Sequence, residues 1–223
     1  METMTFIKHR EIKGDLQNPR YLEVEECETG YLLNVNIEGL KYTFSSHIFE
    51  VPKPDGEHCL VTARDMSGYK ALIRNHQQSR ELQYIDVGAG LGEFTPNLIR
   101  KFDSLPYKPI IIDPFNYDLA TEMMEYAFDK VPEISQPRLI ELLDRIRIIK
   151  DKNKIRLINT KLSEAIVNFP EIMGISDVVL DSHGAYTHQS GETYLSADRK
   201  ERKKIIKNLL YSLGKPNAEI LIE

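Results

Sequence analysis

The stretch Tyr84–Ile99, YIDVGAGLGEFTPNLI, decides the fold class of this 223-residue chain. Its apolar start predicts a buried strand, and glycines then occupy every second position: Gly88, Gly90 and Gly92. A helix is expected next, capped by Thr95 and with Pro96 at its first position, where the missing N–H loses no hydrogen bond. Strand, glycine turn and helix in this order are typical of an α/β protein whose backbone approaches a ligand closely.

The spacing of the glycines separates two classes of α/β protein. Dinucleotide-binding turns use G-x-G-x-x-G, which directs helix N–H groups at a pyrophosphate. This chain has G-x-G-x-G instead, with Asp86 two residues before the first glycine. The pattern resembles motif I of the class I S-adenosylmethionine-dependent methyltransferases.

The resemblance implies that the turn binds the methionine and ribose portion of S-adenosylmethionine, with Asp86 near its amino group. The cofactor carries an ammonium and a sulfonium group and no phosphate, so a carboxylate suits this turn. The alternative is a tight strand–helix turn of some other α/β protein. The residues of the turn expected to contact the cofactor are Asp86, Val87, Gly88, Ala89, Gly90 and Gly92.

A second acid follows the next predicted strand, Pro109–Asp113. Asp113 lies 21 residues after Gly92, close to the offset of about 20 residues at which an acid reaches ribose hydroxyls in such folds. A carboxylate can accept hydrogen bonds from both vicinal hydroxyls. In the resembling family the ribose-binding acid lies here; the alternative is an ordinary turn or helix-capping aspartate before Pro114. Phe115 and Asn116 on the same loop could flank the adenosine, and Pro114 and Phe115 are expected among the cofactor-binding residues.

The third strand is expected at Lys154–Asn159 and is followed by the position that often faces adenine in the family. The residues there are Lys161, Leu162 and Ser163. The family commonly has an acid at this position and this chain does not. A fourth strand is expected at Ser176–Asp181.

The C-terminal part predicts an amphipathic helix over Ser196–Leu213, ended by Gly214, and a fifth strand over Ala218–Ile222. Together these patterns predict a Rossmann-like, mostly parallel sheet with helices on both faces. The antiparallel strand pair that ends the family's sheet is not expected. An open sheet edge invites pairing, so a homodimer is one expectation.

The N-terminal part has a different pattern. Three short pieces between Arg20 and Glu50 alternate apolar and polar residues and are separated by turn residues, which predicts an antiparallel β-meander. We therefore expect a β-rich appendage over residues 1–60 and an S-adenosylmethionine-binding domain over residues 61–223.

Candidate catalytic residues are grouped after the fourth strand, at the carboxyl edge where ligands of α/β sheets bind. They are Asp181, which could also contact the cofactor, His183 and His188. Methyl transfer is an in-line displacement that depends mainly on alignment, and a base is needed only when the acceptor must lose a proton. Histidine titrates near neutral pH and suits that role, although these histidines could instead cap a helix or face water.

The predicted function is transfer of a methyl group from S-adenosylmethionine to a small-molecule oxygen or nitrogen, with S-adenosylhomocysteine as product. The family's D/N-P-P-Y/F signature for amino methylation is missing from the loop SHGAYTH, and so is a cysteine pair for pyrimidine carbon methylation. The alternative is a non-catalytic S-adenosylmethionine-binding or scaffold protein. The glycine spacing disfavours an NAD-dependent oxidoreductase.

Composition supports a cytoplasmic protein that does not enter membranes. The net charge is −5, no apolar run is long enough to span a bilayer, and the N-terminus has no signal-peptide core. Cys27 and Cys59 lack metal-ligand spacing, and no metal site is predicted.

One basic run, Arg199–Lys204, could be a solvated helix face or a nucleic-acid contact. No aromatic residue interleaves with it, so the solvated face is favoured and nucleic acid is not expected as a partner.

Overall fold

The computed structural model describes residues 5–12, 20–27, 30–37, 40–44, 82–91, 94–101, 107–128, 136–181, 184–188 and 198–222. The chain divides into two compact units. The first combines Met1–Cys59 with Asn116–Ile146, and the second combines Leu60–Phe115 with Arg147–Glu223. No helix in the described ranges is long and apolar enough to cross a membrane.

The first unit contains a four-stranded antiparallel sheet in the order β1-β2-β3-β4. Its strands are β1 (Thr5–Ile12), β2 (Arg20–Cys27), β3 (Gly30–Ile37) and β4 (Leu40–Phe44). The helix α3 (Tyr117–Phe128) contacts β2 and β3, and α4 (Gln136–Lys150) begins in this unit.

The second unit contains a five-stranded sheet in which every neighbouring pair is parallel, in the order β7-β6-β5-β8-β9. Its strands are β5 (Tyr84–Val87), β6 (Ile110–Ile112), β7 (Arg156–Ile158), β8 (Ser176–Asp181) and β9 (Gly214–Ile222). The predicted α/β class and the parallel sheet are confirmed.

The order of the strands creates a switch point beside β5. The chain runs from β5 through β6 to β7 on one side, and then returns to the other side of β5 to form β8 and β9. Connections leave β5 and β8 in opposite directions, and ligands of open α/β sheets bind where this happens, at the carboxyl ends of the strands. The two strands meet in register, with Asp86 beside Leu180.

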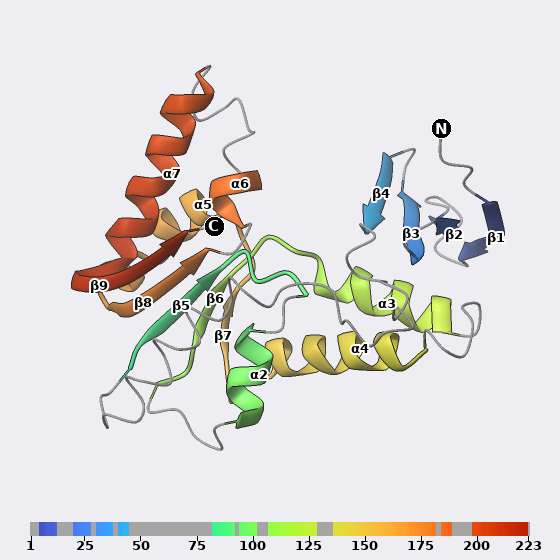
Figure 1. The fold of residues 1–223 in the computed structure, drawn as a ribbon, viewed down its shortest axis with the longest axis horizontal. Coiled ribbons are helices and arrows are strands. Elements are labelled where there is room, and N and C mark those ends of the chain that lie inside the picture. The colour runs from blue at the N-terminus through green and yellow to red at the C-terminus, as the bar shows by residue number, and fades with distance from the viewer. Residues whose placement is uncertain are drawn as a thin grey trace, which may run out of the picture. The chain divides into compact units, whose positions relative to one another are not determined.

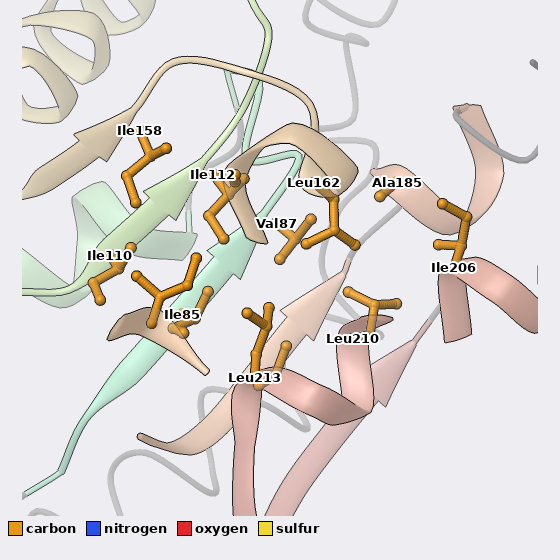
Figure 2. Packing of buried hydrophobic residues seen from close by; sticks show 13 residues of the cluster. Ile85, Val87, Ile110, Ile112, Ile158, Leu162, Ala185, Ile206, Leu210 and Leu213 are labelled. Atoms are coloured by element: carbon orange, nitrogen blue, oxygen red, sulfur yellow. The ribbon is translucent and has the colours of Figure 1, made fainter. Parts of the chain in front are cut away.

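Alternating side chains of the strands pack against helices on both faces of the sheet. One face carries Ile85, Val87 and Val179 and packs against α5 (Leu162–Asn168), α6 (Ala185–His188) and α7 (Arg199–Leu213), as Figures 1 and 2 show. The other face carries Tyr84, Val178 and Leu180 and packs against α2 (Phe94–Lys101). A short 3-10 helix, η3 (Pro170–Ile172), follows α5.

The predicted start of the helix after the glycine turn is wrong by two positions. The helix α2 begins at Phe94, so Thr95 is not its cap and Pro96 is not its first residue. The Thr95 hydroxyl donates a hydrogen bond to the Asp86 carboxylate instead of capping the helix. Pro96 still lies in the first turn, where backbone N–H groups have no partner within the helix.

The C-terminal prediction is confirmed at the end of the helix and corrected at the strand. The helix α7 ends at Leu213 and Gly214 caps it, as expected, but it begins at Arg199 with Asp198 as its N-cap, not at Ser196. The strand β9 begins at Gly214, earlier than predicted. Its first residues bulge, because Ser176 pairs with Gly214 and Val178 with Glu219, and bulges carry no simple sequence signal.

Candidate functional site

The glycine turn after β5 is attached to β6 and to the residue that follows it by hydrogen bonds from two backbone N–H groups. Gly88 and Gly90 have φ angles of 72° and 51°, a region that favours glycine. The N–H of Gly88 donates to the carbonyl oxygen of Ile112 at 2.9 Å. The N–H of Gly90 donates to Asp113 Oδ2 at 2.5 Å. The turn therefore lies across the carboxyl ends of β5 and β6.

The two glycines of this turn have different surroundings. A Cβ on Gly88 would lie 2.3 Å from the Cα of Gly184, in the segment after β8. A Cβ on Gly90 would meet no described heavy atom within 4 Å. Gly88 is thus packed against a neighbouring segment, whereas no atom of the described residues occupies the space beside the backbone of Gly90.

The Asp113 carboxylate joins the glycine turn to the turn after β6. Its Oδ2 accepts the N–H of Gly90, and its Oδ1 accepts the N–H of Phe115 at 2.8 Å. The residue is 4% exposed. These two bonds tie the glycine turn to the turn after β6.

Asn159, directly after β7, holds the same turn from the other side. Its Nδ2 donates to the carbonyl oxygens of Asp113 and Phe115, at 2.6 Å and 2.9 Å. The sequence prediction missed this residue. Its position as the last residue of a predicted strand, at the carboxyl edge of the sheet, is the signal that could have found it.

Asp86 lies on the α2 face of the sheet and is 3% exposed. Its Oδ2 accepts a hydrogen bond from Thr95 Oγ1 at 2.6 Å, and the Tyr84 hydroxyl lies 3.3 Å from the same Oγ1. This buried network connects β5 to the first turn of α2. It gives the Asp86 carboxylate a local partner on the helix.

Asp181 is the last residue of β8 and is completely buried on the opposite face, beneath α6. Its Oδ2 accepts the N–H of Tyr186 at 2.7 Å. Its Oδ1 accepts no hydrogen bond from the part of the chain that the structure describes. Burial raises the pKa of this carboxyl to about 6, and nearby backbone N–H groups of Tyr186, Gly184 and Ala185 offset part of that increase.

Gly184 brings the end of β8 into contact with the glycine turn. A Cβ on Gly184 would lie 2.2 Å from the carbonyl oxygen of Val87 and 2.6 Å from Asp181 Oδ1. Only a residue without a side chain fits between these two oxygens. The prediction singled out Asp181 but not Gly184, because a glycine in a loop has no pattern of its own.

The other predicted cofactor residues differ in exposure. Val87 and Leu162 are buried in the apolar cluster beside Ile112 (Figure 2). Lys161 is the N-cap residue of α5 and makes no side-chain capping bond. Partly buried positions are Ala89, Lys161, Phe115 and Ser163, and Pro114 is exposed.

Of the two predicted catalytic histidines, only His188 lies in the described part of the chain. Gly92 and His183 lie outside the described residues. His188 is the last residue of α6. The site that the structure does define consists of the glycine turn, Asp113, Asn159 and the pair Asp181–Gly184.

The defined site contains two buried carboxylates near strand ends, Asp113 after β6 and Asp181 in β8. Carboxylates favour a cationic ligand or donors such as hydroxyl groups, and disfavour phosphate.

No model of a protein family, no curated protein and no solved structure matches this chain.

Proposed function

We propose that the second unit is a Rossmann-like domain that binds S-adenosylmethionine and transfers its methyl group to a small-molecule oxygen or nitrogen. The observation that carries the proposal is the space beside Gly90, which no described residue fills, next to an N–H that Asp113 fixes. A backbone segment without a side chain, next to an acid and at a strand switch point, is suited to close contact with a ligand.

The residues of the site fit the chemistry of this cofactor. The Asp113 carboxylate directly follows β6 and would accept hydrogen bonds from the ribose hydroxyls. Phe115, on the same turn and partly buried, would lie beside the adenosine. The positive charges of the cofactor suit a site with the buried carboxylates Asp113 and Asp181.

The bound cofactor would supply an activated methyl group, so the protein has mainly to align the reactants. The backbone of the glycine turn and the Asn159 amide, which holds the Asp113–Phe115 turn, provide a rigid support. Full burial of Asp181 favours a positioning role: its carboxylate holds the N-terminus of α6 through Tyr186. Proton removal from the acceptor is proposed for His183 or His188, on the same segment.

The proposal is tested by titrating the purified protein with S-adenosylmethionine and S-adenosylhomocysteine by calorimetry, with NADH as a control ligand. We expect micromolar binding of the first two and none of NADH. Asp113→Asn should weaken binding of both cofactor forms, and Asp113→Ala should weaken it more. Asp177→Asn is the matched control, because Asp177 lies at the amino end of β8, where its carboxylate bonds Gln83 and Lys215.

Binding to neither cofactor form by the folded protein would refute the proposed function. Binding that Asp113→Ala leaves unchanged would refute the site. Binding without methyl transfer to any of a set of small hydroxyl and amine acceptors would favour a non-catalytic S-adenosylmethionine-binding protein.

A further inference from the structure

The helix α7 has a charge opposite to that of the whole protein. Its 15 residues carry six basic side chains and one acidic one, a formal charge of +5, whereas the whole chain has −5. The basic residues all lie in its first nine positions: Arg199, Lys200, Arg202, Lys203, Lys204 and Lys207. Positive charge is therefore concentrated at one end of one helix.

This arrangement is unfavourable for the helix itself. The N-terminus of a helix is the positive end of its dipole, so cations there are destabilising and would be better placed in the last turn. The last turn of α7 contains no basic residue. Like charges four residues apart also repel, as Lys200 with Lys204 and Lys203 with Lys207 do. Stability of the helix does not explain these lysines.

The exposed basic residues form a stripe with an aromatic ring at its end. Lys200, Lys204, Lys207 and Tyr211 are spaced by four, three and four residues, which places them on one helix face. All four are exposed, Tyr211 by 54%. The opposite face, with Ile206, Leu210 and Leu213, is buried against the sheet. The stripe spans about 17 Å.

Among the described residues, two tyrosine rings on or beside this helix have a lysine over one face. Lys207 Nζ is 5.8 Å from the centroid of the Tyr211 ring. Lys203 Nζ is 5.0 Å from the centroid of the partly buried Tyr186 ring, on α6. No aromatic residue interleaves with the basic run Arg199–Lys204 in sequence. Helical periodicity nevertheless places the ring of Tyr211 on the same helix face as the exposed lysines.

We propose that the stripe Lys200–Lys204–Lys207–Tyr211 is a docking surface for single-stranded nucleic acid. Lysines bind the phosphates, and the exposed ring of Tyr211 stacks on a base. A row of cations with an exposed aromatic residue is the combination that single strands bind without sequence preference. This surface is separate from the proposed methyl-transfer site and does not depend on it.

Two other polyanionic partners fit the stripe less well. A helix that binds an anionic membrane surface needs large apolar residues beside its cations, and the exposed face of α7 offers only Tyr211 among large hydrophobic residues. An acidic protein would match the charge but would give no role to an exposed ring beside the lysines. Single-stranded nucleic acid uses both features.

The test measures binding of a labelled oligouridylate of about 16 nucleotides to the full chain by fluorescence anisotropy, between about 50 and 200 mM salt. The variant is Lys200→Gln/Lys204→Gln/Lys207→Gln. The control variant, Lys150→Gln/Lys152→Gln/Lys154→Gln, removes the same charge from exposed residues elsewhere in the second unit.

We expect the α7 variant to bind the oligonucleotide at least about 10-fold more weakly than the wild type. The slope of log K against log salt concentration should become shallower by about two, because three cations are removed. Its thermal midpoint should equal or exceed that of the wild type, because the lysines repel one another and the helix dipole. Tyr211→Ala should weaken binding about 10-fold, and Tyr211→Phe should not, since stacking needs only the ring.

Three results would overturn the proposal. The two triple variants could bind the oligonucleotide equally well. Polyglutamate or phosphatidylserine vesicles could compete as strongly as unlabelled oligonucleotide, which would assign the surface to another partner. A lower thermal midpoint of the α7 variant would show that these lysines serve the stability of the helix.

Discussion

Gly88 and Gly90 belong to the same turn and have similar backbone angles, yet their surroundings differ. Gly88 is pressed against Gly184, so the β5–β8 junction has no room for one more methyl group. Gly90 is bonded to Asp113, and no described residue fills the place where its side chain would be. The first glycine serves the packing of two segments, and we propose that the second leaves room for a ligand. A glycine-rich pattern alone does not distinguish these roles.

Among single substitutions in this turn, Gly88→Ala is expected to have the largest effect on stability. Its methyl group would clash with the Gly184 backbone, and its φ of 72° would be strained for alanine. Steric overlap and strain together should lower the free energy of unfolding by about 4 kcal/mol or more. Urea denaturation measures it. A loss no larger than that of Gly90→Ala would contradict the distinction between the two glycines.

Asp181 is buried at the β5–β8 junction, and its titration is expected to have the next largest effect on stability. Its pKa is raised from 3.8 to about 6 in the folded protein. Between about pH 4 and pH 6 the folded state therefore retains a proton that the unfolded chain releases, so this carboxyl makes stability fall as pH rises. The loss amounts to about 3 kcal/mol above pH 6.

Asp181→Asn removes this titration and should retain an oxygen for the Tyr186 N–H. The unfolding free energy of the variant relative to wild type should rise between pH 4 and 6 and level off above that range, as measured by urea denaturation at each pH. Asp177→Asn, at the opposite end of the same strand, is the control. A difference in unfolding free energy between variant and wild type that stays constant across this pH range would show that the pKa of Asp181 is not raised by folding.

The third prediction tests the β5–β6 junction. Asn159→Ala leaves the carbonyl groups of Asp113 and Phe115 without their shared donor. Unfolding free energy should fall by about 2 kcal/mol, and affinity for S-adenosylmethionine should fall as well, because the turn is no longer held. Asn168→Ala, at an exposed position at the end of α5, should change neither. Calorimetric titration and denaturation separate the two effects.

The smallest effect on stability is expected for Gly90→Ala. No described atom would clash with the methyl group, so the cost is the backbone strain at φ 51°, about 1 kcal/mol. Affinity for S-adenosylmethionine should nevertheless fall at least about 10-fold, since the methyl group occupies the space beside the turn. Unchanged affinity in a stable variant would argue against a ligand at this position.

The sequence predicted the parts of the fold that depend on neighbouring residues. Apolar runs identified all five parallel strands, and Gly214 identified the end of α7. It placed the start of α2 wrongly because Thr95 has two available partners, the helix N-terminus and Asp86, and only the fold chooses between them. It missed Asn159 and Gly184 because their partners lie on other strands.

The sequence by itself therefore determined the class of fold, the glycine turn and the acids near the strand ends. The tertiary structure decided what each of these residues contacts: Asp86 a helix, Asp113 two turns, and Asp181 the N-terminus of α6. The physical reason is how far apart in sequence the interacting residues are. Strand and helix patterns arise from residues a few positions apart, whereas burial, hydrogen-bond partners and free space at the site depend on segments that only the folded sheet brings together.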